Sequence, residues 1–401
     1  MGIQELTIVL LILAVIAVWM RVEKAFVDGK AQVLPLRIAV TGTRGKSGVV
    51  RMIYAILREA GMRVVAKTTG AESLIINETG GENIVKRKGR TTILEQKDLL
   101  RIAGDRSAQA LVTELMSIGP ETLAAESIRI IKPHLLVITN VRLDHMDQCG
   151  TTRKEIAGCF AEAIPKNSTV FVPDIEIFPV FQERVRLSQS RLISVKCEER
   201  EEKLIRREIP GYEFMQNIRL ALKVADFLGI ERDVAYAAMR KVPADPGSLR
   251  IWRLDLSLPK RVWYLVNAFA ANDPESTRQI MDVLRKKPEL CKRKWIGLLN
   301  LRKDRGSRTR QWEKAIRQKM FPELRRMIFL GDHGEILKKS LTHQFGEENV
   351  IVIQTRDGRN IMEKLTQLEK QPAVIVGMGN IGRAGISLVD HWDRIGNRYD
   401  L

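Results

Sequence analysis

A candidate phosphate-binding loop has the sequence Gly42-Thr43-Arg44-Gly45-Lys46-Ser47. Backbone N–H groups in a glycine turn, together with the start of a following helix, attract phosphate anions. Lys46 can reach the terminal phosphates of a nucleotide, and the Ser47 hydroxyl can bind Mg²⁺. The apolar run before the loop predicts a strand, and residues 48–60 after it predict a helix, which is the context that such a loop requires. Val40 stands where the commoner pattern has its first glycine, so this is a shorter variant. An ordinary strand–helix turn is the alternative.

Candidate metal ligands follow two later apolar runs. Glu114 closes the run 110–115, and a carboxylate in a buried strand has to be paired or bound to a metal. We therefore interpret Glu114 as a Mg²⁺ ligand, with a helix-capping or salt-bridged glutamate as the alternative. Asp144, His145 and Asp147 follow the apolar run 135–139 and place groups that bind metals or transfer protons within a few residues of one another. Their position after a strand favours a functional rather than a structural histidine.

These residues need strands whose carboxyl ends meet at one edge of a sheet. Strands and helices are expected to alternate between residues 31 and 243, which predicts an α/β fold with a mostly parallel sheet covered on both faces. Ligands of such sheets bind beyond the carboxyl ends of the strands, so the loops after Val40, Leu115 and Thr139 are expected to converge on one crevice. The expected strands are Leu36–Val40, Arg63–Lys67, Ala110–Leu115, Leu135–Thr139 and Ser168–Val172.

A second domain is expected after the breaker cluster Val242-Pro243-Ala244-Asp245-Pro246-Gly247. Strand-like runs restart beyond this cluster, so residues 244–401 are predicted to form a smaller Rossmann-like α/β domain, after a nucleotide-binding domain at 31–243. Its expected strands are Trp263–Ala268, Lys294–Asn300, Met327–Leu330, Val350–Gln354 and Ala373–Gly377.

Residues 1–30 are expected to form an N-terminal hydrophobic anchor with a basic flank. The run Leu6–Met20 is apolar except for Thr7, although a membrane span usually needs roughly 17–25 residues. No small-residue cleavage site follows, so the segment is predicted to stay on the chain. The basic residues after it would keep the remainder on the cytoplasmic side of the cell membrane. A helix that docks on the domain or lies in the membrane interface is the alternative.

The balance of charges limits the partners. The 401-residue chain carries a formal net charge of +18, which suits an anionic partner such as nucleic acid, an acidic membrane, or an acidic substrate or product. Basic tracts such as 86–90 lack the interleaved aromatic residues that stack on bases, so nucleic acid is not expected. The 4 cysteines have no metal-binding spacing and predict reduced thiols, as in the cytosol.

The motifs together resemble the Mur ligase superfamily, whose members use ATP to join a carboxylate to an amino acid. The loop 42–47, then Glu114, then Thr139-Asn140-x-x-x-Asp144-His145-x-Asp147 follow the order of that superfamily. The chain is more closely similar to the ligase subunit of poly-γ-glutamate synthase, the PgsB/CapB family, which also has an N-terminal hydrophobic segment. Further matching motifs are Lys67-Thr68-Thr69-Gly70, Asp245-Pro246-Gly247, Asn267-Ala268-Phe269-Ala270-Ala271-Asn272-Asp273 and Gly377-Met378-Gly379-Asn380-Ile381.

The resemblance implies a role for individual residues. Lys46 would hold the ATP phosphates, Ser47 and Glu114 one Mg²⁺, and His145 a second metal, which makes Lys46, Glu114 and His145 the catalytic group. Asn217 would contact adenine, and Arg250 would reach the phosphates. The nucleotide would also contact Gly42, Thr43, Arg44, Gly45 and Gly48, and the substrate would contact Asn140, Asn272 and Asp273.

Two arginines are predicted to bind substrate because of their positive charge. Arg302 and Arg305 belong to a basic stretch, residues 302–310, that follows the expected strand Lys294–Asn300. Such a stretch could hold substrate carboxylates or a growing polyanion, and a solvated basic loop is the alternative.

The chain departs from the superfamily in three places. Leu143 replaces a glutamate that many Mur ligases have before the Asp-His pair. Gly211-Tyr212-Glu213-Phe214 replaces their Gly-x-His-Asn pattern. Many also have a carbamylated lysine, but the corresponding position falls near Phe160 with no lysine at hand, and Glu162 or water could substitute there.

The expected function is that of an ATP-dependent amide ligase that makes poly-γ-glutamate at the membrane. A γ-carboxylate would be activated as an acyl phosphate and joined to the amine of glutamate, with ATP and Mg²⁺ as cofactors. The resemblance also implies a small integral membrane subunit and an accessory export subunit, similar to PgsC and PgsA, and a homo-oligomer stays open. The alternatives are another Mur-type ligase, similar to folylpolyglutamate synthase, or a membrane-tethered P-loop ATPase that forms no bond.

Overall fold

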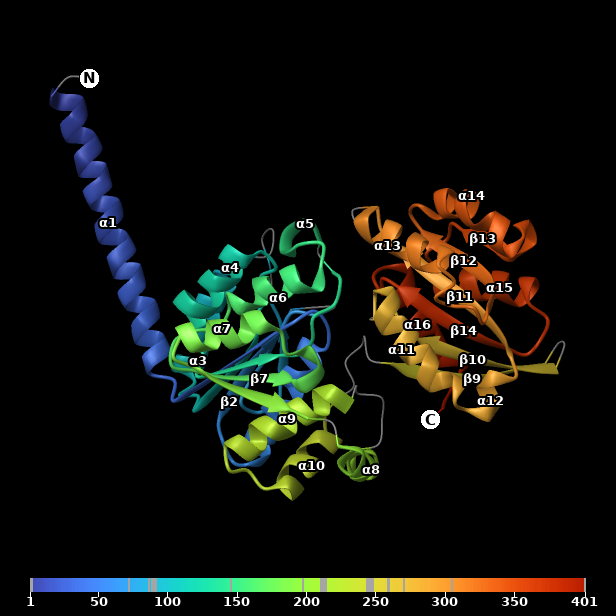
Figure 1. Ribbon diagram of the computed structural model, residues 1–401, viewed down its shortest axis with the longest axis horizontal. Helices are drawn as coiled ribbons and strands as arrows, with labels where there is room; N and C mark the ends of the chain where they lie inside the picture. The colour runs from blue at the N-terminus through green and yellow to red at the C-terminus, as the bar shows by residue number, and fades with distance from the viewer. Residues whose placement is uncertain are drawn as a thin grey trace. The chain divides into compact units, whose positions relative to one another are not determined.

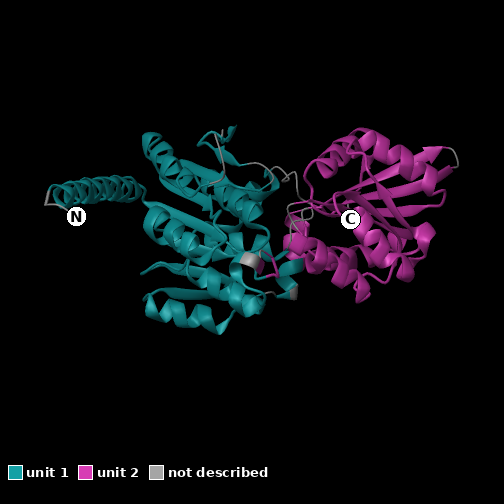
Figure 2. Ribbon diagram, turned by 90° about the horizontal axis from the view of Figure 1, so that it is seen from above, with its two compact units in different colours: residues 1–141, 148–202, 215–242 teal, residues 142–147, 203–214, 243–401 magenta. Residues whose placement is uncertain are grey.

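The computed structural model describes residues 3–70, 73–85, 87, 92–144, 146–196, 198–209, 215–242, 249–257, 260–269, 271–303 and 306–399. The chain divides into two compact units, shown in different colours in Figure 2. Unit 1 comprises Met1–Val141, Gln148–Glu202 and Met215–Val242, and unit 2 comprises Arg142–Asp147, Lys203–Phe214 and Pro243–Leu401. Unit 2 therefore takes in two short segments that precede its main part in the sequence.

Unit 1 is built on an 8-stranded sheet with the order β4-β3-β2-β5-β1-β6-β7-β8. The strands from β2 to β8 in this order run parallel, and β3 and β4 are added antiparallel at one edge. The five strands predicted in this region are present, whereas β3, β4 and β8 were not predicted. In chain order the strands are β1 (Leu36–Thr41), β2 (Val64–Thr68), β3 (Leu74–Ile76), β4 (Glu82–Ile84), β5 (Ala110–Glu114), β6 (Leu135–Ile138), β7 (Thr169–Pro173) and β8 (Arg191–Val195).

Helices flank this sheet (Figure 1), which confirms the predicted α/β architecture. The central strands are buried along their whole length, so their apolar side chains pack against helices on both faces. The helical segments up to residue 240 are α1 (Ile3–Gln32), α2 (Lys46–Glu59), α3 (Glu95–Asp105), α4 (Pro120–Ala124), η1 (Ala125–Ile131), α5 (Met146–Cys149), α6 (Arg153–Ala161), η2 (Asp174–Glu176), α7 (Pro179–Leu187), α8 (Glu199–Glu208), α9 (Met215–Phe227) and α10 (Arg232–Arg240).

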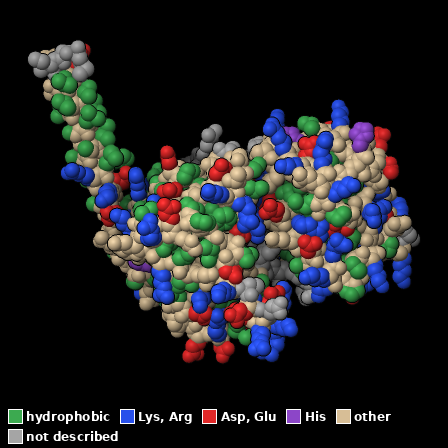
Figure 3. Space-filling view, in the orientation of Figure 1, with side chains coloured by type: hydrophobic (Ala, Val, Ile, Leu, Met, Phe, Trp, Pro, Cys, Tyr) green, Lys and Arg blue, Asp and Glu red, His purple; other side chains and the backbone are tan. Residues whose placement is uncertain are grey.

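Helix α1 is longer than the apolar run in the sequence because it continues through charged residues that pair with unit 1. Lys97 pairs with Glu23 and Lys132 with Asp28, while Val27 is buried. The apolar side chains before them are exposed, and they appear as a mainly hydrophobic surface in Figure 3. By length and composition, Gln4–Gln32 is long and apolar enough to cross a membrane.

Unit 2 is built on a 7-stranded sheet with the order β13-β12-β11-β14-β10-β9-β15. The strands from β13 to β10 in this order run parallel, and β9 and β15 are antiparallel additions that were not predicted. Separate apolar clusters cover the two faces of the sheet. The strands are β9 (Arg250–Ser257), β10 (Lys260–Asn267), β11 (Lys294–Leu301), β12 (Leu324–Gly331), β13 (Val350–Ile353), β14 (Ala373–Gly379) and β15 (Asn397–Arg398), and the helices are α11 (Pro274–Arg285), α12 (Pro288–Cys291), α13 (Gly306–Arg317), α14 (Gly334–Phe345), η3 (Glu347–Asn349), α15 (Gly358–Leu368) and α16 (Ala384–Ile395).

Candidate active site

The sheet of unit 1 places three predicted site loops side by side. Strands β5, β1 and β6 are neighbours, with Val40 opposite Glu114 and Thr41 opposite Ile138. Because the strands are parallel, their carboxyl ends lie at the same edge of the sheet. The loop 42–45, the end of β5 and the loop after β6 therefore meet there.

The phosphate loop depends on two glycines with a positive φ. Gly42 has a φ of 123°, and a Cβ atom there would lie 2.2 Å from Thr139 Oγ1. Gly45 has a φ of 80°, and a Cβ atom there would lie 2.4 Å from Asn217 Nδ2. A larger residue at either position would therefore be strained and would also displace a neighbouring side chain.

Helix α2 begins at Lys46, two residues before the predicted start. Its N-cap is Gly45 in the left-handed conformation, which offers no side chain to cap the helix, and its first turn holds no acidic residue. The first N–H groups of a helix have no partner within the helix, and the helix dipole favours negative charge there. Gly48 lies in this first turn. This end of α2 therefore suits a phosphate.

Lys46, Ser47 and Glu114 form one connected group. Lys46 Nζ donates to the carbonyl oxygen of Gly42 at 2.9 Å and lies 3.8 Å from Glu114 Oε1. The Ser47 hydroxyl donates to Glu114 Oε2 at 2.7 Å. Glu114 is 4% exposed, and its Oε2 also accepts the backbone N–H of Thr69 at 2.8 Å. The carboxylate is thus held at the edge of the phosphate loop by a hydroxyl and an amide.

The fit of a divalent metal ion can be tested on this group. Among the described residues, no three His, Cys, Asp or Glu side chains are grouped to form a protein-only metal site. The Ser47 hydroxyl and the Glu114 carboxylate are hard oxygen donors, and Mg²⁺ is usually held by one or two such ligands together with substrate phosphates. The residues therefore fit an ion that arrives with a nucleotide.

The side chain of Asn140 holds the backbone of the phosphate loop. Its Oδ1 accepts the N–H of Arg44 at 3.0 Å, and its Nδ2 donates to the carbonyl oxygen of Arg44 at 3.0 Å. The N–H of Thr43 donates to the carbonyl oxygen of Asn140 at 3.0 Å. Asn140 was predicted to contact substrate; the structure adds a role in fixing the conformation of the loop.

Three charged residues support this edge: Glu126 and Glu176 were not singled out from the sequence, and Lys67 was noted only as part of a matching motif. Glu126 is fully buried and accepts the N–H groups of Met116 and Ser117 in the loop that follows β5. Glu176 is equally buried and accepts the N–H of Val141 at 3.2 Å. Lys67 is the penultimate residue of β2, and its Nζ lies 3.0 Å from Glu95 Oε2. Each is an ionisable residue in a buried position, and that pattern was the available signal.

Removing the charge of Glu95 is expected to destabilise unit 1 strongly. Lys67 is fully buried, so Glu95→Gln leaves its ammonium group without the paired carboxylate, a loss of about 3–5 kcal/mol in the free energy of unfolding. Chemical denaturation measures this loss in the free energy of unfolding. The double variant Lys67→Met/Glu95→Gln should recover most of the loss, and Arg87→Gln, which removes the exposed partner of Glu95, should change little. A double variant less stable than Glu95→Gln would contradict the argument.

The remaining predicted residues are distributed over both units. Asn217 is buried on α9 and contacts Gly45, so the structure places it beside the phosphate loop. Asp144 belongs to unit 2, where Arg308 pairs with its carboxylate. His145 and Arg305 lie outside the described residues.

The predicted residues of unit 2 lie near the carboxyl ends of its parallel strands. Most of them follow such a strand, and Arg250 begins the antiparallel strand β9 next to the end of β10. Arg250 begins β9 opposite Asn267, the last residue of β10, and its Nη1 lies 3.3 Å from Asp393 Oδ2. Asn272 has a φ of 54°, and Arg302 is an exposed residue directly after β11. Asp273 is 1% exposed, and its carboxylate accepts the N–H of Ser276 as the N-cap of α11, so the structure gives it a partner within the fold.

Comparison with known proteins identifies the class. Residues 40–232 match the Mur ligase middle domain family, and residues 255–395 match the poly-gamma-glutamate synthase CapB C-terminal domain family. The structure is similar to Mycobacterium tuberculosis folylpolyglutamate synthase complexed with ADP and AMPPCP, with a TM-score of 0.67, 16% identity, and coverage of 95% of this chain and 99% of that one. It is also similar to the bifunctional folylpolyglutamate synthase/dihydrofolate synthase of Yersinia pestis, with a TM-score of 0.65, 14% identity, and coverage of 92% and 90%. These likenesses show a shared fold.

Two relatives define the family more narrowly. The chain is 32% identical to PGA synthase CapB of Bacillus subtilis over 94% of this chain and 95% of the relative. It is 30% identical to the capsule biosynthesis protein CapB of Bacillus anthracis over 89% and 76% of the two chains. The fold, the phosphate loop and these matches define an ATP-dependent amide ligase of the Mur type. The chain belongs to the CapB family of poly-γ-glutamate synthases, as its motifs predicted.

Proposed function

We propose that this ligase extends poly-γ-glutamate by joining the γ-carboxylate of a chain end to the amine of a glutamate. The observation that carries the proposal is the connected group Lys46–Ser47–Glu114 at the start of α2, in a chain of the CapB family. In the first step a γ-carboxylate oxygen attacks the γ-phosphorus of ATP in line, and the bond to ADP breaks. In the second step the amine attacks the carbonyl carbon of the acyl phosphate. Phosphate then leaves with the electrons of the C–O bond, and the nitrogen loses a proton.

The residues of unit 1 bind and orient the nucleotide in this scheme. The first N–H groups of α2 receive the phosphates, and the Lys46 ammonium group turns from the Gly42 carbonyl oxygen toward the transferring phosphoryl group. Ser47 and Glu114 would hold Mg²⁺, which supplies electrostatic stabilisation of the phosphoryl charge when bound. Asn140 keeps the loop in the conformation that receives phosphate. Asn217 lies next to Gly45 of the same loop and in our proposal contacts the nucleotide.

The residues of unit 2 are proposed to serve the substrate side of the reaction. Arg250 would reach a phosphate, and Arg302 and Arg305 would pair with glutamate carboxylates, because guanidinium groups bind carboxylates through paired hydrogen bonds. Asn272 and Asp273 would contact the incoming amino acid. Asn272 supports this with a buried Oδ1 that accepts no hydrogen bond from the described residues. The role of His145 at a second metal rests on the motif alone.

Membrane attachment is the further part of the proposal. The exposed apolar part of α1 would insert into the cell membrane and leave both units in the cytoplasm, where ATP is available. A small integral membrane subunit and an accessory export subunit would then receive the polymer, and copies of the chain could associate around them.

Removing residues 2–20 is expected to move the protein from the membrane fraction to the soluble fraction. The deletion ends before Glu23 and Asp28, so the ion pairs that fasten the end of α1 to unit 1 remain, and the fold should persist. Fractionation followed by immunoblotting measures the shift. The matched control replaces exposed leucines 10, 11 and 13 by isoleucine, which preserves apolarity and should stay in the membrane. A truncated protein that still pellets with membranes would contradict the proposal.

One assay tests the proposed reaction against its alternatives. The full chain, purified with its membrane partners, is given ATP, Mg²⁺, a short γ-linked glutamate acceptor and one amino acid at a time, and ADP and amide product are measured. ADP formation that requires glutamate and matches the product supports poly-γ-glutamate synthesis. Turnover with a folate-type acceptor instead would favour the folylpolyglutamate-synthase-like ligase. ATP turnover that is independent of every amino acid would favour the tethered ATPase.

A further inference from the structure

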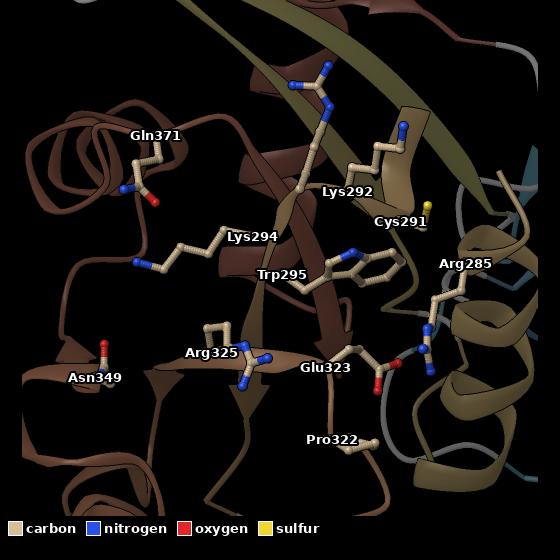
Figure 4. Close-up of a pocket in the computed structure, with 11 residues that line it drawn as sticks. Arg285, Cys291, Lys292, Lys294, Trp295, Pro322, Glu323, Arg325, Asn349 and Gln371 are labelled. Atoms are coloured by element: carbon tan, nitrogen blue, oxygen red, sulfur yellow. The ribbon is translucent and has the colours of Figure 1, made fainter. Parts of the chain in front are cut away.

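A basic cavity of about 730 Å³ lies at the edge of the unit 2 sheet where its parallel strands begin (Figure 4). Its lining includes Lys294 at the start of β11, Glu323 just before β12 and Gln371 just before β14. The predicted substrate residue Arg302 instead follows the end of β11. The 8 residues of β11 separate the two edges by about 25 Å. The cavity is therefore distinct from the carboxyl-end edge of the same sheet.

The cavity has more positive than negative charge. Among the described lining residues, Glu323 alone is acidic, and it is neutralised by Arg278, whose Nη2 lies 2.7 Å from the Glu323 Oε1. Lys294 is neutralised by Glu369, whose Oε2 lies 2.8 Å from the Lys294 Nζ. Arg285, Lys292 and Arg325 are exposed, and none of them forms a salt bridge with an acidic residue in the described part of the chain.

These three cations come from separate elements around one opening. Arg285 ends α11, Lys292 follows α12 and Arg325 belongs to β12. Elements of a packed domain hold the positions of their backbones, so the charges are set apart at fixed places. A ligand with one carboxylate could pair with only one of them, whereas a polymer with a carboxylate on every residue could pair with several at once.

Other polyanions fit the lining less well. The aromatic lining residue, Trp295, is 2% exposed and donates its indole N–H to the Leu290 carbonyl oxygen, so it offers no face for a nucleic acid base. None of the described residues that line the cavity is an exposed large hydrophobic residue that could enter a lipid layer. Guanidinium groups such as those of Arg285 and Arg325 match carboxylates in shape.

We propose that this cavity is a second binding site for the γ-linked glutamate chain, formed by Arg285, Lys292 and Arg325. The identity of the ligand rests on the proposed function, whereas the site itself rests on the charges and the cavity. A chain held there would remain with the enzyme between additions while its growing end leaves and re-enters the active site. The affinity should fall as salt is added, because the pairs are exposed to solvent.

The test measures binding of a short, fluorescently labelled γ-linked glutamate oligomer to the full chain by anisotropy. The cavity variant is Arg285→Gln/Lys292→Gln/Arg325→Gln. The matched control, Lys314→Gln/Lys339→Gln/Lys364→Gln, removes the same charge from exposed positions on α13, α14 and α15. We expect the cavity variant to bind at least about tenfold more weakly than the wild type and the control to change by less than about twofold.

Several outcomes would overturn the cavity site. These are unchanged oligomer binding in the cavity variant, an equal loss in the control, or a loss confined to RNA or to anionic lipid vesicles tested in parallel. Glutamate-dependent ADP formation with a short acceptor is measured on the same proteins and should persist in the cavity variant. Its absence from the wild type would refute the proposed function, and the binding result would still decide the cavity separately.

Discussion

Lys46→Ala is expected to lower glutamate-dependent ADP formation by a factor of about 10³ or more, since catalysis of phosphoryl transfer comes mainly from positioning and charge stabilisation. The Lys46 ammonium group is part of the phosphate loop and lies 2.9 Å from the Gly42 carbonyl oxygen. The rate is measured as ADP released per molecule at saturating ATP. Nucleotide affinity, measured separately, should also fall.

Two further variants separate charge from shape. Lys46→Met keeps most of the length of the side chain without its charge and should be as inactive as Lys46→Ala. Lys166→Ala removes an exposed lysine of the same unit and should leave the rate unchanged. Thermal unfolding of Lys46→Ala should resemble that of the wild type, because the Lys46 side chain is partly exposed. A rate within about tenfold of the wild type would remove Lys46 from the proposed mechanism.

The strands that position the site could be predicted from the sequence because they are buried on both faces. Strands β1, β5 and β6 each contain an uninterrupted apolar run, residues 38–40, 110–112 and 135–138, and a polar residue follows each run. Strand β8 was missed because it lies at the edge of the sheet and its first residue, Arg191, is exposed. Strand β9 was missed because it is antiparallel, with Arg253 and Asp255 exposed on one side, so it has no continuous apolar run.

The missing information concerned contacts between residues far apart in the sequence. The length of α1 depends on partners such as Lys97 and Lys132, which no local pattern connects with Glu23 and Asp28. The clamp of Asn140 on Arg44 likewise requires β1 and β6 to be neighbours. The motifs therefore indicated which residues belong together, and the order of the strands determines which of them hold the loop.

Glu114→Gln is expected to lower turnover by a factor on the order of 10² and to raise the Mg²⁺ concentration needed for half-maximal rate. The amide has the shape of the carboxylate, and its oxygen, in the place of Oε2, can accept both the Thr69 N–H and the Ser47 hydroxyl. The fold should therefore survive while the negative charge that attracts the metal ion is lost. Turnover measured across a Mg²⁺ titration, with the free energy of unfolding determined in parallel, gives both quantities.

The controls for Glu114 distinguish a metal ligand from a purely structural carboxylate. Ser47→Ala removes the other proposed ligand and should shift the Mg²⁺ dependence in the same direction, whereas Glu183→Gln changes an exposed carboxylate on α7 and should shift nothing. If Glu114 only fastened Thr69 and Ser47, the isosteric Glu114→Gln would keep those hydrogen bonds and the wild-type Mg²⁺ dependence. An unchanged titration curve would therefore assign Glu114 to the support of the loop, and a displaced curve with unchanged stability would assign it to the metal.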